Sequence, residues 1–360
     1  MKKIKILGIT LLAFSLITLN NCKKHEENLV TQTCEIDLSD PIPTISKLGM
    51  TPTYSGQQAN WTIDNIIQSI NITSQLGVEV VHFGFLWGDI EHADDSFDWE
   101  LSDQVVQTVH QNGQKVSMVS PIPNTYDLDD IPPFVPFNSF DDPILIEQYI
   151  SFLKDALERY NDKIHYLWIG NEINGYFEEN PDELTAYQTF FESVYDSVKL
   201  DFPSIKIGIT FTYDGTVASN NISILSAFPK ADVLGFSLYP QFLDSNPQNY
   251  ANHLQDLITA TDLIGKPIAI TETTWSSQGF GGSIDNQKLF VKTAVSAFKN
   301  SFNNLEFHSF YSTHDFPKSY IEANLFTGEV AEWLSSMSFI TNEGIPKEAY
   351  CTLVDELRSF

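Results

Sequence analysis

Residues 78–85 read VEVVHFGF, and residues 166–170 read YLWIG. Both runs are apolar almost throughout, whereas a strand with one side in water alternates apolar and polar residues. Strands that are buried on both faces have this composition, and they usually pair in parallel beneath covering helices. The two stretches therefore predict a parallel sheet that other parts of the chain enclose on both sides.

Similar short runs, rich in β-branched and aromatic residues, recur along the chain with segments of helical periodicity between them. The eight candidate strands are residues 45–50, 78–85, 115–120, 165–170, 206–211, 233–238, 267–271 and 305–311. Asp142-Pro143 opens one of the intervening helices with a capping residue and a first-turn proline. No GxGxxG follows the first strand, as an open dinucleotide-binding sheet would require. The pattern predicts a single-domain α/β fold, the (β/α)8 TIM barrel.

The N-terminus carries a targeting signal. Residues 1–21 read MKKIKILGITLLAFSLITLNN, a basic start followed by an apolar run too short to cross a bilayer comfortably. Cys22 comes next, and the stretch resembles a bacterial lipoprotein signal. That resemblance implies lipidation of Cys22 and export to the cell envelope as a membrane-anchored lipoprotein; a signal cut elsewhere and an uncleaved anchor are the alternatives. We expect a signal peptide over residues 1–21, a polar tether over 22–43 and the barrel domain over 44–360.

The other two cysteines lie near the two ends of the mature chain. Exported proteins can form disulfides, and the two ends of a closed barrel lie near each other, so a Cys34–Cys351 disulfide is expected to be possible. Two free thiols are the alternative. No CxxC and no His-x-x-x-His occurs. We therefore expect neither a metal nor a cofactor.

The charge balance restricts the partners. The chain has 20 Lys and Arg against 47 Asp and Glu, a net charge of -27, and its only arginines are Arg159 and Arg358. Nucleic acids and strongly anionic polymers are recognised by clustered cations, so the charge balance argues against both as ligands. We expect a monomer that acts on a neutral ligand.

Two glutamates follow two of the predicted strands. The fourth strand runs into YLWIGNEING (166–175), which places Glu172 just past its end, and the seventh runs into PIAITETTW (267–275), which places Glu272 in a corresponding position. The carboxyl ends of the strands carry the chemistry in TIM barrels, and strands four and seven face each other across the mouth. A facing pair of carboxylates is what retaining glycoside hydrolysis requires.

An Asn-Glu dipeptide after strand four and a Glu after strand seven resemble the signature of clan A glycoside hydrolases. The resemblance implies that Glu172 is the acid/base, that Glu272 is the nucleophile and that Asn171 holds the sugar 2-hydroxyl. Trp87, Ile90-Glu91 and Phe97-Asp98-Trp99 are similar to the segment after strand two in that clan, where we expect Glu91 to be structural. GNEING and VLGFSLYP (233–240) look most like the family 53 endo-β-1,4-galactanases, with families 5, 39 and 42 close.

Aromatic residues near the predicted strand ends are further candidates. Tyr239 follows strand six and is expected to reach the nucleophile. Trp275, Trp87 and Tyr213 are expected to stack on sugar faces, with packing at the rim as the alternative for each. The resulting hypothesis is a retaining endo-β-glycanase that acts on a neutral β-linked polysaccharide or oligosaccharide.

One position departs from the clan. Most members keep an arginine near the end of strand two that steadies the nucleophile, but neither arginine of this chain lies there, and the matching position holds His82. This departure leaves a second hypothesis open, a non-catalytic carbohydrate-binding surface lipoprotein on the same barrel. A metal-dependent barrel hydrolase is a third, which the missing His-x-His on strand one argues against.

Overall fold

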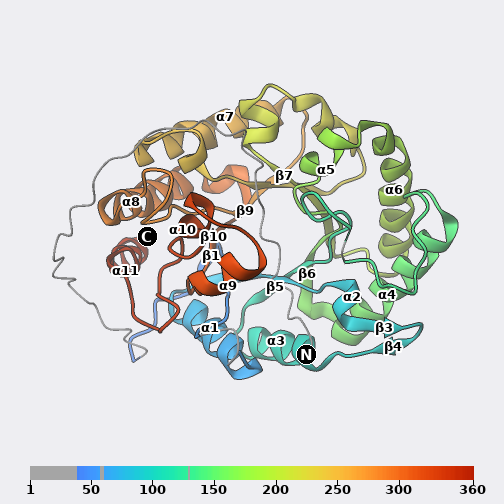
Figure 1. Cartoon of the computed structure of the whole chain (residues 1–360), viewed down its shortest axis with the longest axis horizontal. Helices are drawn as coiled ribbons and strands as arrows, with labels where there is room; N and C mark the ends of the chain where they lie inside the picture. The colour runs from blue at the N-terminus through green and yellow to red at the C-terminus, as the bar shows by residue number, and fades with distance from the viewer. Residues whose placement is uncertain (1–38, 57–60, 129) are drawn as a thin grey trace.

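A computed structural model describes residues 39–56, 61–128 and 130–360. Within these ranges, eight parallel strands close into a barrel in the order β1-β10-β9-β8-β7-β6-β5-β2 (Figure 1). The barrel strands are β1 (Ile45–Thr51), β2 (Val78–Gly84), β5 (Lys115–Val119), β6 (Ile164–Trp168), β7 (Lys206–Thr212), β8 (Val233–Ser237), β9 (Ile268–Glu272) and β10 (Leu305–Tyr311). This confirms the predicted (β/α)8 barrel, with each strand close to its expected bounds.

Helices surround the strands on the outside of the barrel (Figure 1). They are α1 (Ile63–Gln75), α2 (Trp87–Ile90), α3 (Glu100–Gln111), α4 (Pro143–Tyr160), α5 (Asn174–Glu179), α6 (Leu184–Asp201), α7 (Tyr250–Asp262), α8 (Ile284–Asn300), α9 (Lys318–Asn324), α10 (Glu329–Leu334) and α11 (Glu348–Arg358). A small antiparallel hairpin, β3 (Glu91–Ala93) with β4 (Ser96–Phe97), follows α2 and was not foreseen from the sequence.

The start of α4 follows from its sequence. Asp142 caps the helix by accepting a hydrogen bond from the backbone N–H of Ile144 at 2.9 Å, and Pro143 occupies the first turn. Behind this cap, Leu145, Tyr149 and Phe152 lie on one helical face and are fully buried. The apolar stripe therefore sets which side of α4 packs on the barrel.

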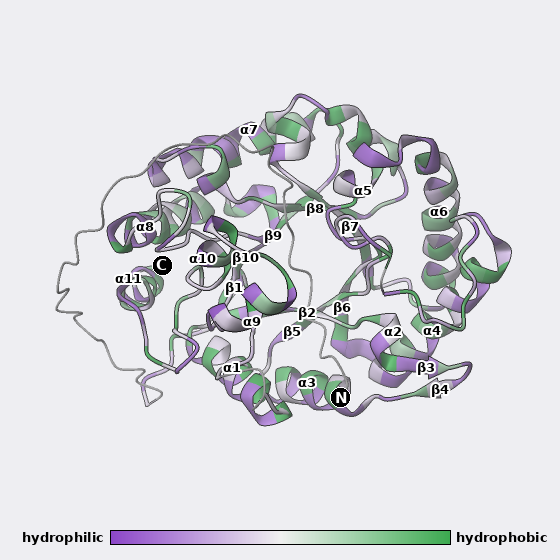
Figure 2. Cartoon of the chain, viewed as in Figure 1, coloured by the Kyte–Doolittle hydropathy of each residue, from purple (hydrophilic) through white to green (hydrophobic). Residues whose placement is uncertain are grey.

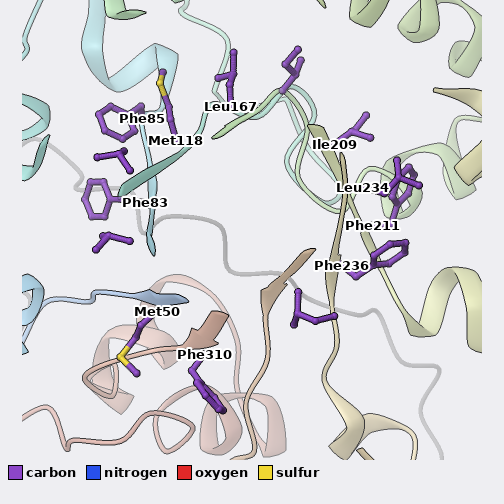
Figure 3. Packing of buried hydrophobic residues seen from close by; sticks show 14 of the residues in the cluster. Met50, Phe83, Phe85, Met118, Leu167, Ile209, Phe211, Leu234, Phe236 and Phe310 are labelled. Atoms are coloured by element: carbon purple, nitrogen blue, oxygen red, sulfur yellow. The ribbon is translucent and has the colours of Figure 1, made fainter. Parts of the chain in front are cut away.

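Alternate residues of each strand face the surrounding helices. Met50, Phe83, Phe211, Phe236 and Phe310 belong to this outward set, and Figure 3 shows them on different strands of the barrel wall. The helices that cover them carry both hydrophobic and hydrophilic residues (Figure 2), as expected for helices with one buried face. The main hydrophobic core is thus a shell between the sheet and the helices.

The other alternate residues fill the barrel itself. We call this the inner cluster; its members are Val80, Val119, Tyr166, Trp168, Val233, Ala269 and Phe307. The Trp168 indole occupies space that Gly208 and Gly235 leave on the neighbouring strands, because a Cβ at either glycine would meet its ring at 2.5 or 2.7 Å. Trp168 is therefore a core residue that closes the barrel below its mouth.

Two findings concern the ends of the chain. No helix in the described ranges is long and apolar enough to cross a bilayer. Cys351 on α11 takes part in a disulfide. Cys22 and Cys34, on which the lipidation and disulfide predictions depend, lie outside the described residues.

Candidate active site

The two glutamates lie at the same end of the barrel. Glu272 is the last residue of β9, and Glu172 lies four positions after the end of β6; only β7 and β8 separate these strands in the barrel order. Both residues are buried: Glu172 is 0% exposed and Glu272 is 4% exposed. The carboxyl ends of the parallel strands therefore place both carboxylates in the mouth.

Glu172 has an unusual backbone. Its φ of 48° lies in the left-handed region, which residues other than glycine rarely adopt. Thr210 of β7 stabilises the turn, because its hydroxyl oxygen accepts the Glu172 N–H at 2.7 Å. Strained conformations of this kind persist where the surrounding structure determines them, and they cluster at functional sites.

The Glu172 carboxyl is held in a low-dielectric environment. Thr125 donates its hydroxyl to Oε2 at 3.4 Å, and the Ser237 hydroxyl at the end of β8 lies beside the carboxyl. Burial raises the pKa of Glu172 well above its ordinary value, and the charge of Glu272 raises it further. The hydroxyls of Ser237 and Thr125 oppose this shift without cancelling it. Glu172 is therefore suited to hold a proton near neutral pH.

Glu272 interacts with Tyr239, which donates its hydroxyl to Oε2. Burial raises the pKa of Glu272 to about 7, and the hydrogen bond from Tyr239 acts in the opposite direction. Glu172 accepts a long hydrogen bond from Thr125, and the charge of Glu272 adds to burial in raising its pKa well above the ordinary value. The arrangement therefore favours ionised Glu272 beside protonated Glu172.

Two tyrosines interact electrostatically with both carboxyls. The pKa values of Tyr239 and Tyr311 are both raised, first by burial and then by the charges of both Glu272 and Glu172. Each phenol thus lies within electrostatic range of both carboxylates. The side chains of Glu172 and Glu272 therefore share one polar site in the mouth of the barrel.

Asn171 lines a pocket with Glu272, Asn124 and Tyr311. Its Oδ1 accepts the Thr210 hydroxyl at 2.8 Å, and its Nδ2 donates to Asn124 Oδ1 at 3.2 Å. The amide orientation is thereby fixed from both sides, which leaves the second Nδ2 hydrogen for a ligand. This geometry suits the contact with a sugar hydroxyl that the clan resemblance implies.

His82 on β2 lines the same pocket and is 3% exposed. Burial lowers its pKa to about 3, so the ring is neutral at physiological pH. The two arginines lie elsewhere: Arg159 pairs with Asp103, and Arg358 with Asp40. His82 therefore occupies the expected place without supplying the positive charge of the clan arginine.

Three aromatic candidates are not sugar platforms in this structure. Trp87 is 1% exposed, lies against Tyr149 and Phe152, and donates its Nε1–H to Glu91. Trp275 is fully buried against Phe290 of α8. Tyr213 is 3% exposed within the main core, with its ring against His253. Position near a strand end does not decide which way a side chain points, and these three point into the shell between strands and helices.

Sequence reasoning missed several polar residues at the site. They are Asn124, Thr125, Thr210 and Ser237, which contact Glu172 or Asn171. The period-two alternation of a strand could have found two of them, since Thr210 and Ser237 lie on the same face of their strands as the inner residues Gly208 and Val233. Asn124 and Thr125 lie in a loop, where no such periodicity exists.

Among the described residues, Glu91, Asp94 and Asp95 lie close enough together to contact one cation. Both Glu91 oxygens already accept hydrogen bonds, from Trp87 Nε1–H and from the Asp95 backbone N–H. The two aspartates are exposed. This group belongs to the β3–β4 hairpin region, and its bonds give Glu91 the structural role expected from the sequence.

The sequence matches one family model, glycosyl hydrolase family 53, over residues 146–304. The matched segment includes Glu172 and Glu272, and it confirms the resemblance seen in GNEING and VLGFSLYP. No curated protein sequence matches the chain.

Solved glycoside hydrolases share the fold. An exo-β-1,4-mannosidase from Opitutaceae bacterium strain TAV5 superposes with a TM-score of 0.68 at 15% identity, over 91% of this chain and 62% of its own. A GH5_18 protein from Bifidobacterium longum, solved with Manβ1-4GlcNAc, gives 0.67 at 14% identity over 88% and 78%. A family 39 glycoside hydrolase from Bacteroides cellulosilyticus WH2 gives 0.63 at 14% identity over 91% and 65%. The chain thus spans less than two thirds of the first and third of these proteins.

Proposed function

We propose that this chain, a glycoside hydrolase by family and fold, is a retaining endo-β-glycanase that uses Glu272 as nucleophile and Glu172 as acid/base. The observation that carries the proposal is the pair of buried carboxyls with unequal surroundings. Tyr239 donates a hydrogen bond to Glu272, while burial and the neighbouring charge keep the proton on Glu172. Environments that separate the pKa values of two carboxyls assign them different roles.

In the first step, the Glu272 carboxylate attacks the anomeric carbon of the substrate. The glycosidic C–O bond breaks, and the leaving oxygen takes the proton of Glu172. The product is a glycosyl ester on Glu272 with inverted configuration. Asn171 contributes by holding the sugar hydroxyl next to the reacting carbon.

In the second step, a water oxygen attacks the same carbon while its proton passes to Glu172. The ester bond to Glu272 breaks, and a second inversion restores the original β configuration. Tyr239 stabilises the departing carboxylate through the hydrogen bond that it already makes. Both glutamates return to their starting protonation states.

The substrate that we propose is a neutral β-linked glycan, with β-1,4-galactan first because of the family 53 match. The net charge of -27 disfavours an anionic polymer, and both arginines are engaged in ion pairs with Asp103 and Asp40. Residues 1–38 lie outside the described part, so signal cleavage and lipidation of Cys22 remain proposals. Labelling with a lipid precursor in wild type and Cys22→Ala tests them.

The decisive experiment follows hydrolysis of neutral β-glycans and aryl β-glycosides by wild type and Glu272→Ala. We expect wild type to release products that first appear in the β configuration by NMR, and an activated 2-fluoro sugar to label Glu272. Equal background rates in both proteins, or label on another residue, would refute the proposal.

The neutral His82 favours a second function, carbohydrate binding without cleavage, because no fixed positive charge stabilises Glu272 there. Calorimetry separates the two functions. A protein that binds an oligosaccharide tightly yet leaves it uncleaved over days would be a binding protein.

A further inference from the structure

Three buried side chains form a hydrogen-bonded chain inside the barrel. Trp168 Nε1–H donates to Ser117 Oγ at 2.7 Å, and Ser117 Oγ lies 2.9 Å from His82 Nδ1. Ser117 and Trp168 are fully buried, and His82 is 3% exposed. The three residues come from β6, β5 and β2, so the chain spans the wall from the inner cluster to the pocket.

The donors and acceptors in this chain determine where the protons lie. An indole N–H only donates, so Ser117 Oγ must accept from Trp168. The Ser117 hydroxyl proton then has His82 Nδ1 as its acceptor. If Nδ1 carried a proton instead, the Ser117 proton would have no acceptor in the hydrogen bonds that the described residues make. A neutral ring that accepts at Nδ1 carries its proton on Nε2.

His82 Nε2 has no hydrogen-bond partner among the described residues. A buried donor left unpaired is costly, by about 1–3 kcal/mol, unless a ligand or an ordered water pairs with it. The ring also lines the pocket that Glu272 and Asn171 share. The unpaired donor therefore belongs to a residue that lines the pocket beside the proposed nucleophile, above the rings of Trp168 and Phe307.

We propose that His82 is a neutral hydrogen-bond donor to the sugar in the catalytic subsite, with its Nε2–H tautomer fixed by Ser117 and Trp168. The inference rests on the proposed glycosidase function and adds a specificity determinant to it. Where clan members place a charged arginine, this chain places an uncharged donor. The subsite thus prefers a sugar hydroxyl to a uronate carboxylate, which would face Glu272 and Glu172 without a cation.

Kinetics of four variants test the inference on the aryl β-glycoside that wild type cleaves fastest. His82→Phe keeps a ring and removes both nitrogens, and we expect kcat/KM to fall about 10- to 100-fold. His82→Gln retains an N–H donor near the Nε2 position and should recover most of that loss. Ser117→Ala should lower kcat/KM about 3- to 10-fold, because the His82 ring would then no longer be held in the Nε2–H tautomer.

The double variant separates positioning from packing. Because Ser117 acts on the sugar only through His82, adding Ser117→Ala to His82→Phe should cost almost nothing further. Full additivity of the two losses, or a His82→Gln variant as slow as His82→Phe, would overturn the proposal. Thermal unfolding of each variant is the control, and if His82→Phe does not fold, the His82→Gln and Ser117→Ala comparison carries the test.

A second readout does not depend on catalysis. Nitrogen-15 NMR of the histidine rings, with His82 assigned by its disappearance in His82→Gln, should give the Nε2–H tautomer in wild type and a mixture in Ser117→Ala. A wild-type Nδ1–H tautomer overturns the inference even in an active enzyme. Conversely, the expected tautomer in a protein that cleaves no glycoside would mean that the glycosidase proposal has failed while the proton arrangement stands.

Discussion

The inner cluster and the mouth of the barrel are neighbouring regions, joined by the hydrogen bonds from Trp168 through Ser117 to His82, but they differ in how their polar groups are paired. In the inner cluster, Phe307 packs on Tyr166 and Trp168 with ring centroids 5.0 and 6.0 Å apart, and the polar atoms of the latter two are hydrogen-bonded. In the mouth, two carboxyls are buried together, and His82 Nε2 has no partner among the described residues. The lower region is arranged for stability, whereas the upper one retains desolvated polar groups that are available to a ligand or to water.

Removing Glu272, the proposed nucleophile, should have the largest effect on activity. Glu272→Ala should lower kcat by about 10⁴-fold or more, because no other group can form the glycosyl ester. Azide should restore turnover and give a glycosyl azide of inverted configuration, identified by NMR. Glu306→Ala, at the opposite end of β10 in an ion pair with Lys206, is the matched control and should keep its activity. A retained-configuration azide product would contradict the assignment of Glu272.

Removing Glu172, the proposed acid/base, should have an effect that depends on the leaving group of the substrate. Glu172→Ala should lose about 10²- to 10⁴-fold in kcat/KM on substrates whose leaving group needs protonation. On a 2,4-dinitrophenyl glycoside, glycosyl-enzyme formation should stay near the wild-type rate, measured by the burst of released phenol. An equal loss on both substrates would exclude the acid role.

The inner cluster should respond in stability rather than chemistry. Phe307→Ala removes a fully buried ring and should cost about 3–5 kcal/mol of the free energy of unfolding, measured in urea. The fall in activity of the folded fraction should be much smaller than that of Glu172→Ala. A variant as stable as wild type would mean that the barrel interior can collapse around the lost ring.

The smallest expected effect is a gain in the free energy of unfolding when Glu272 is replaced by Gln. The pKa of Glu272 is raised from 4.5 to about 7 on folding, so the folded state binds this proton more tightly than the unfolded state. The contribution of this proton to the free energy of unfolding is therefore fully present below pH 4.5 and is lost as the pH rises through about 7. Glu272→Gln should be more stable than wild type by on the order of 2 kcal/mol at pH 8, with little difference at pH 4. Urea unfolding at both pH values provides the comparison, and a gain independent of pH would point to packing instead.

The difference between the two regions also explains what the sequence could predict. Apolar runs such as VEVVHFGF identify strands because burial on both faces selects composition, and Glu172 and Glu272 follow from the ends of those runs. Tyr239 was placed correctly beside Glu272. The expected sugar contacts of Trp87 and Trp275 were wrong. Beyond the last paired residue of a strand, the alternation that sets side-chain direction no longer applies. The neutral state of His82 depends on desolvation, which only the assembled barrel reveals.

The chain enters β1 at the end of the barrel opposite the mouth. Asp40 is tied to Arg358 on α11, and β1 begins at Ile45, so the polypeptide arrives at the amino ends of the parallel strands. The mouth that holds Glu172 and Glu272 is at the other pole of the molecule. The proposed attachment through the leading segment would therefore act at the pole opposite the mouth of the barrel, which would leave the mouth open to the proposed glycan substrate.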